Sequence, residues 1–135
     1  MYLERPFVIT LPMHPINNNL YVNLPRGGRA LSKEARAWKT GARAAIFATR
    51  PRMVPTNQPV CVSIFMHLSH DRDIDSVKLL LDAMTGLVYT DDSLIWRMSV
   101  GKKVDTKDDN SSVMVYQYTP DHFFEFDSDV RKDGM

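Results

Sequence analysis

Short apolar runs, separated by polar and proline-rich segments, dominate the sequence. The run at residues 7–11 is rich in β-branched and aromatic side chains and ends at Pro12, so it predicts a first strand. The longer apolar run at residues 60–68 is typical of a strand in the centre of a sheet. Residues 94–104 and 112–118 predict two more strands, which the polar turn between them would join as a hairpin.

Two segments show helical spacing instead. Ser32 is a suitable N-cap with Glu34 in the first turn, which predicts a helix over residues 33–49 that ends before Pro51. A second, short helix is predicted over residues 77–84. The expected buried positions of the first helix are Ala35, Trp38, Ala42, Ala45 and Ile46. Those of the second are Val77, Leu80, Leu81 and Met84.

These elements predict a single small α+β domain with a mixed sheet of about four strands and two helices. The chain has 135 residues, of which 44% are hydrophobic, enough for one core but not comfortably for two. We expect the domain to span residues 1–120, with a long loop at residues 12–28. Residues 121–135 form an acidic tail whose phenylalanines either dock on the domain or a dimer partner, or belong to a disordered extension.

Three single residues are expected in the core: Cys61, which has no second cysteine to pair with, and the tryptophans Trp38 and Trp96. No apolar stretch approaches the roughly 20 residues that span a bilayer, and the first residues do not form a basic segment followed by an apolar run. We therefore expect a cytosolic protein with no membrane partner.

Charge is distributed unevenly along the chain. Residues 1–52 contain nine Lys and Arg against two acids, whereas residues 53–135 contain eight against fourteen, although the net charge is only +1. A basic half facing phosphates beside an acidic half that holds metal would suit a metal-dependent nuclease, and a basic stripe of Arg36, Lys39 and Arg43 on the first helix fits DNA contact. Alternatively, the two halves neutralise each other across the fold.

Candidate chemistry is concentrated after the central strand. Asp75, Lys78 and Asp82 share one side of the second helix by spacing, and Asp91-Asp92 follow it. Mg²⁺ prefers oxygen ligands, which Asp73, Asp75 and one acid of the later pair could provide. Bound Mg²⁺ would polarise a phosphodiester and generate hydroxide from water, with Lys78 neutralising negative charge in the transition state.

Two other interpretations of this acidic segment remain open. Asp71, Asp73, Asp75 and Asp82 fall at positions 1, 3, 5 and 12 of an EF-hand calcium loop, but Ser76 replaces the usual glycine and an apolar strand precedes the loop. The segment could also be a solvated, aspartate-rich helix start in which Asp75 or Ser76 serves as the N-cap.

Short motifs follow one another in a fixed order along both halves of the chain. In the acidic half they are Asp73-Ile74-Asp75-Ser76, Lys78, Asp82-Ala83-Met84 and Asp91-Asp92. In the basic half they are Ile9-Thr10-Leu11-Pro12, Pro15 with Asn17 and Asn18, Tyr21, Gly28-Arg29, Leu31-Ser32 with Glu34, and Trp38. This ordered set resembles the RusA family of Holliday junction resolvases, and the likeness covers roughly residues 6–118.

The resemblance implies a homodimeric, Mg²⁺-dependent endonuclease, with Mn²⁺ able to substitute, that places paired symmetric nicks in four-way or other branched DNA. Family members are often carried by phages. By position, Asp73, Asp75 and Asp92 match the metal-binding acids, Lys78 the catalytic lysine, and Asp91 an additional acid. Basic residues on the DNA path would include Arg29, Lys102 and Lys103, while Asn17 and Asn18 either contact DNA or merely turn the chain.

Two departures from the family pattern motivate an alternative function. Ser76 stands where the family usually has Asn, and the step from Asp75 to Lys78 is one residue shorter than in some members. The alternative is a catalytically weak or inactive protein of the same fold that binds branched DNA. An active enzyme with Asp75 changed to Asn would lose cleavage and keep binding, whereas a binding protein cuts nothing even before mutation.

Overall fold

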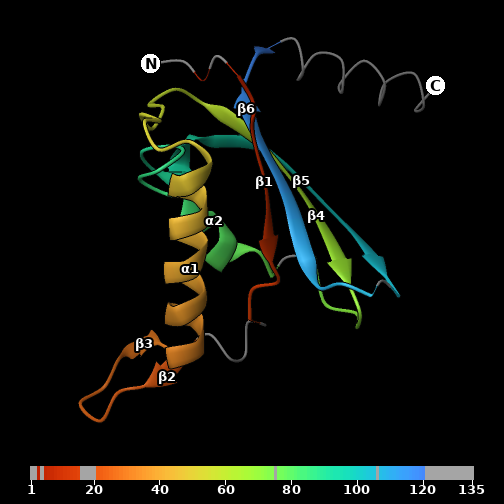
Figure 1. Ribbon diagram of the computed structural model, residues 1–135. Coiled ribbons are helices and arrows are strands. Elements are labelled where there is room, and N and C mark those ends of the chain that lie inside the picture. Colours follow the sequence, from red (N-terminus) through yellow and green to blue (C-terminus); the bar gives the residue numbers. More distant parts are fainter. Residues whose placement is uncertain (1–2, 4, 16–20, 75, 106, 121–135) are drawn as a thin grey trace, which may run out of the picture.

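A four-stranded mixed sheet with two α-helices on one face forms the domain (Figure 1). The computed structural model describes residues 3, 5–15, 21–74, 76–105 and 107–120. The sheet order is β1-β6-β4-β5, in which β4 pairs in parallel with β5 and all other pairs are antiparallel. Its strands are β1 (Phe7–Pro12), β4 (Val60–Leu68), β5 (Ile95–Val104) and β6 (Asn110–Gln117). The helices are α1 (Lys33–Thr49), α2 (Lys78–Met84) and the short 3₁₀ helix η2 (Asp92–Leu94).

The core lies between the helices and the sheet. Along β1 buried and exposed residues alternate, because one face of this edge strand meets the helices and the other does not. The most apolar strand, β4, has neighbours on both sides and contributes the largest share of buried residues, including Cys61. The predicted central position of this strand and the predicted burial of Cys61 are both confirmed.

The predicted hairpin between the last two strands is wrong. β4 lies between β5 and β6, so these strands do not pair with each other. A parallel pair such as β4 and β5 needs a crossover connection, which α2 and η2 provide, and β6 then pairs with the opposite edge of β4. Because β5 is consequently an edge strand, Trp96 is 63% exposed and packs edge-on against Tyr118 instead of entering the core.

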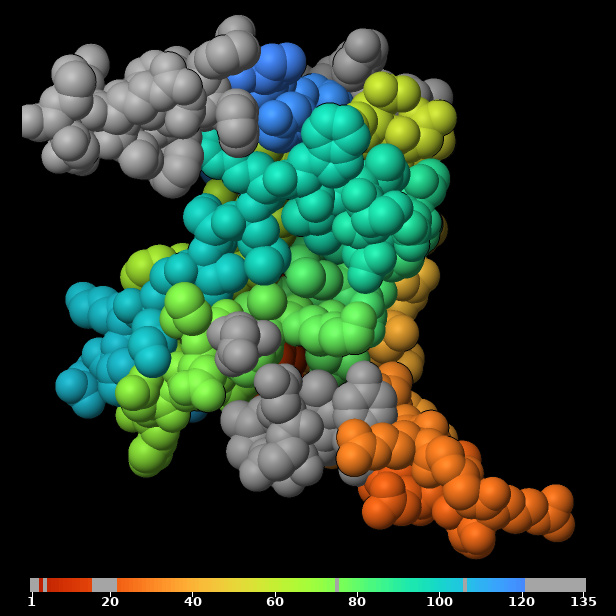
Figure 2. Space-filling view, turned by 180° about the vertical axis from the view of Figure 1, so that it is seen from behind, coloured from red at the N-terminus to blue at the C-terminus, as the bar shows by residue number. Residues whose placement is uncertain are grey.

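A hairpin that was not predicted begins within the predicted long loop. β2 (Tyr21–Asn23) and β3 (Arg29–Leu31) pair antiparallel, and Gly27 and Gly28 adopt positive φ angles in the turn between them. In a three-residue strand the alternation of apolar and polar residues is too short to be recognised in a segment rich in proline and asparagine. This hairpin projects from the rest of the molecule at the N-terminal end of α1 (orange in Figure 2).

The bounds of α1 agree with its predicted ones, and Ser32 accepts the capping hydrogen bond from the Ala35 amide. Ala35, Ala42 and Ile46 are buried as predicted, and Trp38 is half-buried against the core. Ala45 is exposed, so this prediction is wrong: the contact with α2 and β1 covers a narrower stripe of the helix than the spacing indicated. Neither α-helix of the described ranges is long and apolar enough to cross a membrane.

Candidate active site

A shallow hollow of about 290 Å³ lies where α1, α2 and η2 meet. Lys39 and Arg43 of α1 line one side of it, and the acids and a threonine that follow α2 line the other. The apolar side of α2 is buried against the core, with Val77, Leu80 and Met84 almost inaccessible, which turns its polar side toward the hollow. The complete lining is Lys39, Arg43, Asp82, Thr85, Asp91 and Asp92.

Three aspartates therefore face two cations across this hollow. Asp82 also lies 3.8 Å from Lys78, one turn earlier on α2. A hydrogen bond from the Ser93 hydroxyl holds the pKa of Asp91 below its ordinary value, so this carboxyl stays ionised near neutral pH. The arrangement combines negatively charged oxygen ligands with positive charge that phosphates would attract.

Arg43 has a structural task in this hollow besides its charge. Its Nη1 donates hydrogen bonds to the carbonyl oxygens of Ala83 (3.2 Å) and Thr85 (2.7 Å), which belong to the C-terminal end of α2, where carbonyl groups lack partners within the helix. It thereby ties the two helices together directly beside the acids.

Replacing Arg43 with Met is expected to lower the free energy of unfolding by about 1.5–3 kcal/mol, because the bonds are charge-assisted and the carbonyls lose their partner. Urea denaturation measures this. Arg36→Met is the matched control, since Arg36 is exposed on the same helix, and a change within about 0.5 kcal/mol is expected there. Equal losses in the two variants would contradict this role of Arg43.

The remaining predicted acidic and lysine residues are only partly brought together. Asp73 is exposed on the loop between β4 and α2 and is not among the residues that line the hollow. Asp75 lies outside the described residues, as do Asn17 and Asn18. Lys78 is the first residue of α2 and is exposed, with its ammonium near Asp82. Asp82 was recognised in the acidic cluster but left out of the predicted ligands, although it lines the hollow.

The donor chemistry fits a hard divalent cation, but the described residues do not complete a site. Asp73, Asp91 and Asp92 offer exposed carboxylates. Among the residues that the structure describes, no group of three His, Cys, Asp or Glu side chains is close enough to hold a metal ion. A cation site at this place therefore needs Asp75 or a movement of the exposed acids.

The calcium-loop alternative meets a contrary observation, whereas the solvated helix start is supported in part, because Asp71 and Asp73 are exposed. Asp71, which would be the first ligand of an EF-hand loop, instead pairs with Lys102 at 2.6 Å. The aspartate-rich N-cap is also not formed by Ser76: α2 begins after Val77 without a side-chain capping bond, and the Ser76 hydroxyl donates to the Asp73 carbonyl oxygen at 2.8 Å.

The predicted DNA-contacting residues that the structure describes are spread over the β2-β3 hairpin, α1 and β5. Arg36 is exposed on α1, Lys39 lines the hollow, and Arg29 is exposed on the projecting hairpin. On β5, Lys103 is exposed, whereas Lys102 is held by Asp71 and by the carbonyl oxygen of Arg72 at 2.8 Å. Lys102 thus supports the loop that leads to Asp73, in addition to carrying charge.

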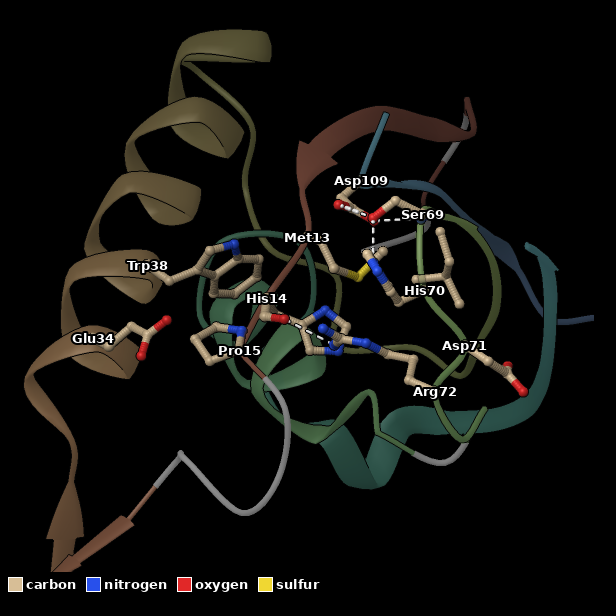
Figure 3. A pocket seen from close by; sticks show the side chains of 11 residues that line it. Met13, His14, Pro15, Glu34, Trp38, Ser69, His70, Asp71, Arg72 and Asp109 are labelled. Carbon is tan, nitrogen blue, oxygen red and sulfur yellow. Dashed lines mark hydrogen bonds between the residues drawn. The ribbon is translucent and has the colours of Figure 1, made fainter. Parts of the chain in front are cut away.

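A second, larger cavity of about 580 Å³ is lined in part by Ser69, His70, Asp71 and Arg72 of that loop (Figure 3). His14, from the segment that follows β1, lies between Trp38 and Arg72 in this view. It is 1% exposed, and its ring meets the indole of Trp38 edge-on with centroids 5.7 Å apart. Asp109 accepts hydrogen bonds from Ser69 at the end of β4. The spacing of the histidines in the sequence contained no signal for this position of His14.

His14 is electrically neutral in the fold. Burial lowers its pKa from the ordinary 6.5 to about 4, the hydrogen bond to the Ser76 carbonyl acts in the opposite direction, and the charge of Arg72 lowers it further. The ring atom Nε2 faces that carbonyl, which only accepts, so Nε2 carries the proton.

Acid should therefore destabilise the protein in part through His14. The unfolded chain binds a proton at this residue near pH 6.5, whereas the folded chain does so only near pH 4. Stability is expected to fall as the pH decreases across this window, by at most about 1.4 kcal/mol per pH unit from this group. Urea denaturation of wild type and His14→Gln across the window isolates the contribution, and parallel stability curves would refute it.

Comparison with known proteins agrees with the motifs. The family model described as endodeoxyribonuclease RusA matches residues 12–116, which include β2, β3, both helices, the acidic loop and nearly all of β6. A comparison with curated proteins gives no match. Since the family model covers most of the chain, from the end of β1 onward, the chain belongs to the RusA endodeoxyribonuclease family.

Proposed function

We propose that this protein is a Mg²⁺-dependent endonuclease that resolves Holliday junctions, or other branched DNA, by paired symmetric nicks. One observation carries the proposal: in a chain of the RusA family, Asp91 and Asp92 share a hollow with Lys39 and Arg43. Acids that would bind a metal ion and basic residues that would bind phosphates thus line the same hollow, as cleavage of one phosphodiester requires. The match of residues 12–116 supports nuclease chemistry for this hollow.

Asp73, Asp75 and Asp92 would hold Mg²⁺, which when bound stabilises charge on the phosphate and acidifies a water molecule. The protein's own residues have separate tasks. Lys78, exposed at the start of α2, can approach the phosphate and offset charge in the transition state. Lys39 would position the phosphate from α1, and Asp91, whose carboxylate accepts a hydrogen bond from Ser93, would add negative potential for the cation.

DNA contacts would extend beyond the hollow along the exposed basic residues. Arg29 on the projecting hairpin, Arg36 on α1 and Lys103 on β5 are exposed and can meet phosphates with little rearrangement. Contacts of this kind release counterions, so binding should weaken steeply as salt rises.

Two nicks in a symmetric junction call for two active sites, which a C₂ homodimer supplies. The face of the sheet opposite the helices is available for this purpose, because no described segment covers it. It holds a groove of about 440 Å³, with Phe65 40% exposed and lying across the backbone of Gly101, where an added Cβ would come within 3.1 Å of its ring. Val8, Met114, Ser63 and Ser99 lie side by side across this face, on β1, β6, β4 and β5, and Ser112 lies opposite Phe65.

We propose this open sheet face as the dimer interface. Phe65→Glu is expected to convert the dimer to a monomer, because each protomer would bury a carboxylate without a partner in the interface, and sedimentation velocity measures this. Val22→Glu, an equally polar change at an exposed position of β2, is the control and should remain dimeric. A dimer that survives Phe65→Glu would place the interface elsewhere.

The experiment for the proposed activity is cleavage of a labelled four-way junction by the wild-type protein, with linear duplex as control, in Mg²⁺, in Mn²⁺ and in EDTA. Symmetric nicks that require metal, in the junction alone, are the expected result. Tight junction binding without nicks in any metal would overturn the proposal and favour the catalytically inactive binding protein.

A further inference from the structure

Hydrogen bonds join the loop that carries the first two predicted metal ligands to a single residue, His14. Arg72 and Ser76 lie immediately on either side of residues 73–75. Arg72 Nη1 donates to the carbonyl oxygen of His14 at 2.8 Å, and His14 Nε2 donates to the carbonyl oxygen of Ser76. Both ends of the short segment are therefore attached to the same point of the structure.

Further bonds close the segment on itself and on the sheet. The amide and the hydroxyl of Ser76 both donate to the carbonyl oxygen of Asp73, at 3.3 and 2.8 Å. Lys102 of β5 donates to the carbonyl oxygen of Arg72 from the other side. While Arg72 and Ser76 are held in this way, the hydrogen bonds from Ser76 to the Asp73 carbonyl oxygen are hard to break.

His14 is well placed to be the fixed point of this arrangement. Its ring is buried against Trp38, whose indole nitrogen donates to the carbonyl oxygen of Pro12 at 3.0 Å and so attaches the end of β1 to α1. Its second nitrogen, Nδ1, is buried and has no hydrogen-bond partner among the described residues. Burying a polar atom without a partner costs free energy of folding, and the hydrogen bond from Nε2 to Ser76 offsets part of this cost.

We propose that His14 is a positioning residue that holds the loop carrying Asp73, a predicted metal ligand, in the position that metal binding requires. The proposal rests on the proposed function, because it assigns a purpose to the loop in a metal-dependent nuclease. It also gives Ser76 a role: its backbone carbonyl, hydroxyl and amide, rather than an amide side chain, fasten the loop in this protein.

The first test compares His14→Leu with His14→Gln. Leucine fills the space without a donor, whereas the glutamine amide nitrogen can reach the Ser76 carbonyl as Nε2 does. Mn²⁺ affinity is measured by electron paramagnetic resonance without DNA, and amide hydrogen exchange reports on residues 71–78. His14→Leu should weaken Mn²⁺ binding by about 10- to 100-fold and speed exchange in this loop, and His14→Gln should restore most of both.

Gln117→Leu is the matched control for lost stability. The Gln117 side chain donates to the Pro59 carbonyl oxygen at 2.9 Å, and Gln117 pairs with Val60, at the opposite end of β4 from the acidic loop. It should lower the free energy of unfolding without changing Mn²⁺ affinity. Mn²⁺ affinity of His14→Leu within about twofold of wild type, or an equal loss in Gln117→Leu, would overturn the proposal.

Arg72→Met keeps the test decisive if His14→Leu does not fold. Removing a cation beside the aspartates should by electrostatics alone strengthen Mn²⁺ binding, whereas loss of the bond to His14 should weaken it. Weaker binding supports the positioning role, and stronger binding refutes it. If the wild type binds no Mn²⁺, the metal-dependent function fails, while the exchange rates of the His14 variants still decide whether this residue holds the loop.

Discussion

Asp92→Asn should cut a four-way junction on the order of 10²- to 10³-fold more slowly than the wild type, with junction affinity in EDTA unchanged. Asp92 lines the hollow with Lys39 and Arg43, and of the three proposed metal ligands it is the one described there. The amide keeps the shape of the side chain but removes the charge that a divalent cation needs. Single-turnover cleavage in Mg²⁺, together with gel-shift binding in EDTA, separates the two effects.

Asp105→Asn provides the control for the loss of one negative charge. Asp105 is exposed in the turn after β5 and has a φ of 71°, a conformation that asparagine tolerates well. Its cleavage rate should match that of the wild type. If Asp92→Asn cuts as fast as Asp105→Asn, the hollow between α1 and α2 is not the catalytic site.

Leu80→Ala should lower the free energy of unfolding by about 2–5 kcal/mol. Leu80 is fully buried on α2, in the core cluster shared with β4 and α1, and alanine would leave a cavity that the close packing cannot fill. Because α2 connects the acidic loop to the hollow, cleavage activity should also fall at temperatures where the wild type is fully folded. Urea denaturation and thermal unfolding measure the loss.

The same substitution at an exposed position is the appropriate comparison. Leu24 lies at the end of β2 with 44% of its surface exposed, so Leu24→Ala should change stability by no more than about 0.5 kcal/mol. A similar loss in both variants would mean that the difference in burial does not determine stability here.

Local patterns predicted the separate elements well. A cap at Ser32 with a proline after the C-terminal end defines α1, and an unbroken apolar run defines β4, because both signals lie within a few residues of the element. The pairing of strands could not be predicted in this way. Which strand lies beside β4 depends on packing between residues far apart in the sequence, and the short polar turn before β6 imitated a hairpin signal.

The site shows the same division. The acidic cluster and the family motifs identified Asp91 and Asp92, and the basic stripe on the first helix identified Lys39 and Arg43. The fold brings these four residues into one hollow. The hydrogen bonds from Arg43 to the end of α2 have no sequence signature. Their acceptors are backbone carbonyl groups, which every residue has, so no residue type marks them. His14 was missed for the same reason: its partners are the backbone carbonyl of Ser76 and the side chain of Arg72.

The position of β1 in the sheet has a consequence for synthesis of the chain. Among the described strands, β1 pairs only with β6, and Phe7 lies opposite Val115. During translation β1 leaves the ribosome long before β6. Its backbone therefore has no strand to pair with until residue 117 has left the ribosome. Closing so long a loop is slow, which predicts that the sheet is completed in a late, concerted step.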